Sequence, residues 1–156
     1  MIKVKTLHIE EFRGIRTLDL KLNAKNFGIC GPNGTGKSGV VDAIEFCITG
    51  DVTRLSGQGS TVLSVKAHAP HVDQHDHPEK AIVSIAADIP ALGKSVTITR
   101  SVKTPRKVTI IPDSAQIKGV IAELQTHPEF ALSRREIIKY IITPPGQRSK
   151  DVQTLY

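Results

Sequence analysis

The sequence predicts an α/β fold, in which a glycine-rich loop joins a strand to a helix on a mixed β-sheet with an antiparallel meander alongside. Three observations lead to this prediction. The string Gly31-Pro32-Asn33-Gly34-Thr35-Gly36-Lys37-Ser38 matches the complete pattern G-x-x-x-x-G-K-[ST]. Apolar residues recur at helical spacing after that loop, and several shorter segments alternate with the two-residue period of half-buried strands.

The order of these patterns divides the chain, treated as one domain over 1–156, into four parts. A loop-and-helix core is expected over 1–50, a long polar loop over 51–80, a meander over 81–111 and a helical part over 113–156. Strands are predicted at 2–10, 15–22, 81–88, 95–102 and 107–111, with a further short buried strand at 26–30. Helices are predicted from Gly36 to a stop at Gly50, from Asp113 or Ser114 to about Gln125, and over 134–142. A last helix pattern runs to Tyr156, so we expect the chain to be part of a longer protein.

The bulk properties are those of an ordinary cytoplasmic domain. The 156 residues suit one hydrophobic core, and no apolar stretch approaches the roughly 20 residues that cross a membrane. The N-terminus alternates charged and apolar residues, unlike a signal peptide. The two cysteines, Cys30 and Cys47, flank the loop, and we expect both to be buried free thiols, as a reducing compartment favours.

A net charge of +6 makes a polyanion such as DNA a reasonable partner, with general solubility as the alternative reading. Aromatic residues make up 4% of the chain and do not interleave with the basic ones, which argues against base stacking. Contact with DNA would therefore be made to backbone phosphates. The candidate basic residues are Lys103, Arg106, Lys107, Arg134, Arg135, Arg148 and Lys150.

Each position of the glycine-rich loop has a chemical reason. Glycines at 34 and 36 allow backbone N–H groups to turn toward phosphate oxygens, where a side chain would block the approach. The helix that begins there adds unpaired N–H groups and the positive end of its dipole. Lys37 would neutralise the β- and γ-phosphates, and the Ser38 hydroxyl would coordinate magnesium. The alternative is a glycine-rich turn that binds nothing, and the flanking strand and helix patterns argue against it.

The residues around the loop resemble a known family. Ile9-Glu10-Glu11-Phe12-Arg13-Gly14-Ile15, then GPNGTGKS, then Val41-Asp42-Ala43-Ile44 is similar to the N-terminal ATPase lobe of the SMC, RecF and SbcC type. The resemblance covers about the first 50 residues, and a weaker one returns at 132–138 and 145–148. The segment 51–128 would be the variable β-subdomain of that family.

This resemblance implies a nucleotide site and a partner lobe. ATP and Mg²⁺ would be bound by Arg13, Asn33, Gly34, Thr35, Gly36, Lys37 and Ser38, with Ser38 as the metal ligand. A C-terminal ATPase lobe, from the same or a partner chain, would follow a coiled coil and complete the site. Two such heads would sandwich ATP as a homodimer, in DNA repair, maintenance or defence.

Several parts of a complete ATPase site are not recognisable here. The strands that end at Asp88 and Asp113 lack the following glutamate that would activate water, and we interpret both as plain strand ends. Neither Gln125 nor Gln147 is assigned as the family's magnesium-reaching glutamine, and Leu55-Ser56-Gly57-Gln58 is a chance likeness to an ABC signature. We therefore expect weak ATP–Mg²⁺ binding and negligible hydrolysis by this chain alone.

Other readings stay open. The residues His68, His71, Asp73, His75, Asp76 and His77 crowd into one loop; their types suit a metal, but their irregular spacing favours a solvated polar loop. A transporter-type ABC subunit shares GPNGTGKS, although the Phe12-Arg13-Gly14 turn argues against it. A small GTPase would need an Asn-Lys-x-Asp guanine reader, which the chain lacks. A non-catalytic module that binds DNA or a partner, with a structural loop, is the third alternative.

Overall fold

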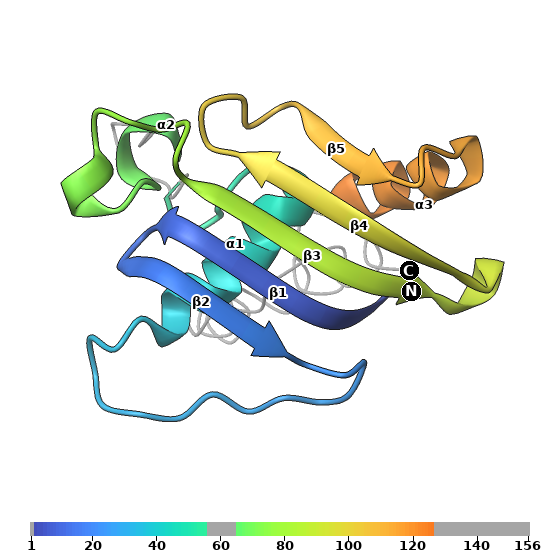
Figure 1. Ribbon diagram of the computed structural model, residues 1–156, viewed down its shortest axis with the longest axis horizontal. Helices are drawn as coiled ribbons and strands as arrows, with labels where there is room; N and C mark the ends of the chain where they lie inside the picture. Colours follow the sequence, from blue (N-terminus) through green and yellow to red (C-terminus); the bar gives the residue numbers. More distant parts are fainter. Residues whose placement is uncertain (1, 56–64, 127–156) are drawn as a thin grey trace, which may run out of the picture.

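A five-stranded antiparallel sheet packs against two helices in the computed structural model, which describes residues 2–55 and 65–126 (Figure 1). The strand order is β2-β1-β3-β4-β5. The strands are β1 (Lys3–Phe12), β2 (Ile15–Lys21), β3 (Ile82–Ile89), β4 (Lys94–Ser101) and β5 (Val108–Ile111). The helices are α1 (Lys37–Thr49), α2 (Val65–His68) and α3 (Ala115–Thr126), with short 3-10 turns η1 (Val72–Gln74) and η2 (Pro90–Leu92). No helix in the described ranges combines the length and the apolar character that spanning a bilayer would require.

The α/β class is confirmed, and five of the six expected strands and the two expected helices that lie in the described ranges fall within a few residues of their predicted bounds. The expected strand at 26–30 is wrong. That segment runs back alongside β2 in extended form without joining the sheet, and Phe27 and Ile29 are 52% and 40% exposed (Figure 1). Its apolar pattern suits a buried strand, but none of the described strands pairs with it. The sheet is therefore antiparallel throughout the described residues, not mixed. The helix expected at 134–142 lies outside them.

The alternation along β1 explains how the sheet covers the helices. Leu7 and Ile9 are buried on the helix side, whereas His8 and Glu10 lie on the opposite, open face. The pairing register places His8 opposite Asp19 of β2 and Ser84 of β3. A register shift between Val4 and Thr6 interrupts this alternation by one residue, so that Val4 and Leu7 both pack on the core side.

Helix α1 is fixed to the sheet at its C-terminal end. The last carbonyls of a helix have no partner within it, and here Arg100 of β4 supplies donors. Its Nε donates to the carbonyl of Cys47 at 3.0 Å and its Nη2 to that of Ile48 at 2.9 Å. The guanidinium is buried, which lowers the pKa of Arg100, and its charge complements the negative end of the helix dipole. Gly50 then ends the helix in a left-handed conformation, with its N–H on the Phe46 carbonyl.

The two cysteines differ in environment. The expectation that both are buried is correct for Cys47 and wrong for Cys30. Cys47 is buried on α1, where desolvation raises the pKa of its thiol to about 12 and its Sγ lies 3.4 Å from the carbonyl oxygen of Ile98. Cys30 is exposed, because the segment that carries it does not enter the sheet. Both thiols are free.

We predict that Gly50→Ala strongly destabilises the fold. The backbone of Gly50 has φ 84°, and an added Cβ would overlap the Pro105 carbonyl and lie 2.8 Å from Arg100 Nη1. Left-handed strain costs about 1 kcal/mol, and overpacking adds about 1–3 kcal/mol. Denaturant unfolding should show a loss of at least about 2 kcal/mol. Gly93→Ala is the matched control, because Gly93 also has positive φ but open space around it. Equal losses at both positions would contradict the role given to the helix end.

We predict that the pKa of His8 lies above its usual 6.5. The hydrogen bond from Nδ1 to Asp19 Oδ1, 2.7 Å long, is the largest cause, and Glu10 adds a smaller effect. Because the folded-state pKa is raised, this pair stabilises the fold fully below pH 6.5, and the contribution disappears as pH rises through the raised value. An NMR titration of the imidazole should show Asp19→Asn lowering this pKa more than Glu10→Gln. The reverse order would contradict the assignment.

Candidate phosphate-binding site

The glycine-rich loop leads directly into α1 with the backbone conformations that the sequence requires. Gly34 and Gly36 have φ of 85° and 84°, which non-glycine residues rarely adopt. Gly36 is the N-cap of α1 and has no side chain to occupy the helix's first N–H groups. Those amides, with the positive end of the helix dipole, therefore face the loop as anion donors.

Lys37 and Thr35 hold the loop in its present shape. The Lys37 amine donates to the carbonyls of Gly31, at 2.7 Å, and Pro32. The Thr35 hydroxyl also donates to the Pro32 carbonyl, at 2.9 Å. Ser38 follows in the first turn of α1 and is exposed. The lysine thus has protein acceptors, while the serine hydroxyl is accessible to a ligand.

Arg13 lies beside this loop because of the hairpin between β1 and β2. Arg13 and Gly14 form a two-residue turn, and Arg13 takes φ 57°, the sign that such turns favour at their first position. Its side chain reaches α1, where Nε donates to Asp42 Oδ2 at 3.2 Å. Its Nη1 donates to the carbonyl of His68 at 3.3 Å. Arg13 therefore connects the hairpin, the helix and the segment that begins at residue 65.

The segment 65–77 forms the opposite wall. Its backbone is attached to the hairpin turn by two hydrogen bonds, from the Arg13 N–H to the Ala69 carbonyl and from the His71 N–H to the Glu11 carbonyl, and Pro70 bridges to Phe12. The expected long loop is thus, over its described part, a docked segment with α2 and η1. Between it and the glycine-rich loop lies a cavity of about 520 Å³. Its lining includes Arg13, Asn33, Gly34, Gly36, Lys37, Ser38, Asp42, His68, Pro70 and His75.

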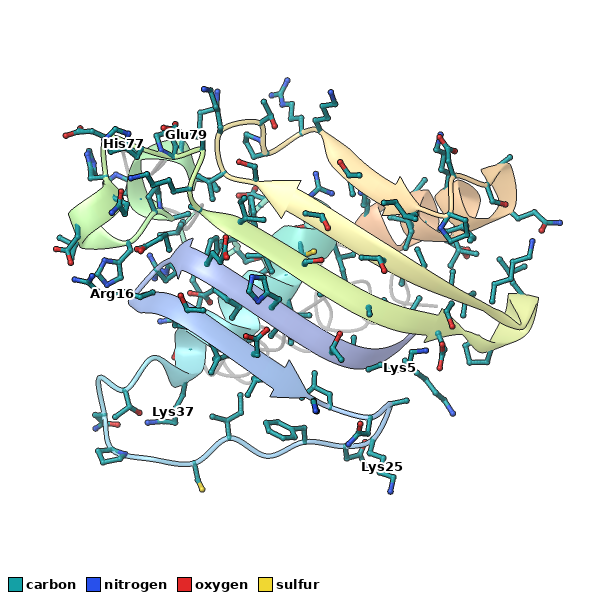
Figure 2. All side chains as sticks on the ribbon, viewed as in Figure 1. Lys5, Arg16, Lys25, Lys37, His77 and Glu79 are labelled. Atoms are coloured by element: carbon teal, nitrogen blue, oxygen red, sulfur yellow. The ribbon has the colours of Figure 1, made fainter. Side chains whose placement is uncertain are left out.

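Six of the seven residues predicted for the site line this one cavity; Thr35 does not, and holds the loop instead. Sequence reasoning missed Asp42 and the histidines as lining residues. Asp42 had a usable signal, because it follows Ser38 by one helical turn and so points to the same side of α1. The histidines had none, since only the backbone pairing at 69–71 brings their segment to the loop. Figure 2 shows Lys37 at the start of α1, and Arg16 near the docked segment, where it pairs with Asp73.

Within the described residues, no three or more histidine, cysteine or acidic side chains are grouped as a metal ion would require. His71 Nδ1 accepts a hydrogen bond from the Asp73 N–H, and His75 and His77 contact their neighbours Asp76 and Glu79. Asp76 and His77 are exposed, as expected for a solvated loop. His68 and His75, in contrast, line the cavity.

The other acidic and amide candidates lie away from the cavity. Asp88 binds Lys5 at 2.8 Å and Ser95 at 2.7 Å, and Asp113 binds Lys118 at 2.6 Å. Gln125 donates to the carbonyl of Ile48, at the far end of α1 from the loop. The interpretation of both aspartates as plain strand ends agrees with these contacts. Gln147, Gln58 and the basic residues 134, 135, 148 and 150 lie outside the described residues.

These residues fit a nucleotide polyphosphate. The cavity combines inward-turning glycines, a helix N-terminus, an amine and a guanidinium, which are the donors that phosphate oxygens require. The open space at Gly34, where an added Cβ would meet nothing within 4 Å, belongs to the same cradle.

Comparison with protein families agrees with this geometry. A family model described as an AAA domain matches residues 6–154, nearly the whole chain. The chain belongs to this AAA-domain family. Membership makes it an ATPase-type domain, for which nucleotide binding is the expected property. No curated protein matched the sequence.

Proposed function

We propose that this AAA domain binds ATP and Mg²⁺ as the N-terminal lobe of an SMC-, RecF- or SbcC-type ATPase that acts in DNA repair, maintenance or defence. One observation carries the proposal: the hairpin turn with Arg13 and the loop with Lys37 and Ser38 line a single cavity. A transporter-type ABC subunit would not require an arginine-bearing hairpin turn at this position.

The residues of the cavity have separate tasks in this proposal. The loop amides and the first turn of α1 bind the β- and γ-phosphates. Lys37 leaves the carbonyls of Gly31 and Pro32 and takes a phosphate oxygen as its new acceptor. Ser38 holds magnesium through its hydroxyl, and Arg13 adds charge from the hairpin side.

We predict that Lys37→Ala abolishes calorimetric binding of ATP–Mg²⁺, or weakens it at least about tenfold, because one charge-assisted contact to phosphate is lost. Lys25→Ala is the matched control. It also removes one positive charge, but Lys25 precedes the glycine-rich loop and lies away from the cavity (Figure 2). GTP–Mg²⁺ titrated in parallel reports base preference. Equal binding by the wild type and Lys37→Ala would favour the non-catalytic alternative with a structural loop.

The exposed segment 26–30, which precedes the glycine-rich loop, supports the proposal of a partner lobe. Residues 26–30 have the apolar pattern of a sheet strand, yet no strand of the described residues pairs with them. Unpaired extended backbone with exposed apolar side chains is a surface that other strands join readily. The proposed occupant is the C-terminal ATPase lobe of the same or a partner chain, which would also supply the water-activating glutamate. Two such heads would form the homodimer that closes on ATP.

We predict that Phe27→Ser with Ile29→Ser leaves the free energy of unfolding within about 0.5 kcal/mol of wild type, because these side chains are exposed. With that lobe not bound, we expect two copies of the chain to associate through this exposed surface at high concentration, and sedimentation velocity should show that the double variant does not associate. Leu18→Ser is the control, since Leu18 packs against the core and its loss should lower stability. A marked loss of stability in the double variant would mean that the segment is already packed within the chain.

The positive charge of the chain supports the proposal that it contacts DNA. The net charge is +6, and Lys103, Arg106 and Lys107 are exposed together on the turn between β4 and β5. Such a group suits backbone phosphates and does not require base stacking.

A further inference from the structure

Asp42 poses an electrostatic problem that the proposed function leaves unexplained. Its side chain is 1% exposed and lines the cavity that we assign to phosphates. A carboxylate at that place repels an anionic ligand, and the repulsion is stronger in a partly buried site than in water. A role for Asp42 must therefore outweigh this effect.

Two arginines surround this carboxylate. Arg13 Nε donates to Oδ2 at 3.2 Å, and Arg54 Nη1 donates to Oδ1 at 3.4 Å. Two positive charges and one negative charge leave a net charge of +1 in this group. Arg54 does not line the cavity and is more exposed than Arg13. Arg54 thus offsets the carboxylate from outside, and the charge of Arg13 remains effective toward the cavity.

The contacts of Arg13 define the orientation of its guanidinium. Nε is held by Asp42 on α1, and Nη1 by the His68 carbonyl on the docked segment. A guanidinium is planar and rigid, so two fixed nitrogens determine the position of the third. Within residues 2–55 and 65–126, no acceptor contacts Nη2. The side chain is only 26% exposed and lines the cavity, where a phosphate oxygen would be the acceptor for that nitrogen.

We propose that Asp42 is a positioning residue, which holds Arg13 so that its remaining terminal nitrogen binds a phosphate oxygen of the nucleotide. This inference rests on the proposed function and assigns a role to a residue that the phosphate grip itself does not include. The carboxylate opposes the ligand by charge but favours it by orienting Arg13, and the second effect is the larger one.

The substitution Asp42→Asn separates these two effects because they have opposite signs. The amide keeps the shape of the side chain and removes the negative charge. If Asp42 were only a buried structural charge, ATP–Mg²⁺ would bind as tightly as in wild type, or more tightly, because the cavity becomes more positive. If Asp42 positions Arg13, binding weakens in spite of that gain.

The experiment is a double-mutant cycle on the 156-residue chain, with calorimetric titration of ATP–Mg²⁺ into wild type, Asp42→Asn, Arg13→Ala and the double variant. We expect Asp42→Asn to weaken binding about tenfold, the effect of one charge-assisted hydrogen bond. In the Arg13→Ala background the same substitution should not weaken binding and should tighten it, because only the repulsion by the carboxylate is then removed. Unchanged or tighter binding by Asp42→Asn would overturn the inference, as would an equal loss in both backgrounds.

Arg13→Lys provides a test that does not depend on altering buried Asp42. Lysine keeps the positive charge but lacks the rigid fork, so it cannot contact Asp42, the His68 carbonyl and a phosphate together. We expect its affinity to fall nearly to that of Arg13→Ala, and wild-type affinity would overturn the inference. Thermal unfolding of each variant identifies losses caused by misfolding. A wild type that binds no ATP would reject the proposed function itself, whereas normal wild-type binding with an unaffected Asp42→Asn rejects only the positioning role.

Discussion

The attachment of the C-terminal end of α1 to the sheet is the constraint on which the candidate site depends. Arg100 donates to the carbonyls of Cys47 and Ile48, and Gln125 donates a second hydrogen bond to Ile48. These donors satisfy carbonyls that would otherwise be buried without partners, which is costly in a protein interior. Because the helix is rigid and its far end is fixed, the position of its first turn is determined as well. The glycine-rich loop therefore presents its donors at a defined place beside the hairpin.

A second constraint brings the opposite wall to that place. The turn at Arg13 has a left-handed residue, and Glu11 nearby also has positive φ, at 44°. Backbone strain of this kind costs about 1–3 kcal/mol at each residue and persists where surrounding contacts determine it. Here the contacts are the hydrogen bonds that Arg13 and His71 make across to Ala69 and Glu11. The strained hairpin turn and the docked segment thus stabilise each other, and the cavity forms between the segment and α1.

The features that could be predicted from the sequence are those that depend on the spacing of neighbouring residues. Alternation and helical spacing predicted the strands and α1, because each pattern reflects burial against one face. The segment 26–30 shows the limit of this reasoning: it has the apolar pattern of a buried strand, yet no strand of the described residues pairs with it. His68 and His75 could not be assigned to the cavity from sequence, since backbone pairing between 11–13 and 69–71 has no side-chain signature. Asp42 was visible only as part of a motif, and its contacts with two arginines depend on the tertiary fold.

Lys37 and Arg13, the two cations of the cavity, differ in their present hydrogen bonds. This difference determines how much each would contribute to the binding of a phosphate. Lys37 donates to two loop carbonyls, so a phosphate must replace acceptors that the amine already has. The net gain from that exchange is smaller than the strength of the new contact, because hydrogen bonds are lost as well as formed. In the proposed site Arg13 would keep its contacts with Asp42 and the His68 carbonyl while its third nitrogen binds the ligand. An oriented guanidinium loses little conformational freedom on binding. In the proposed site the arginine therefore supplies the preorganised part of the phosphate contact, and Asp42 is the residue that makes it so.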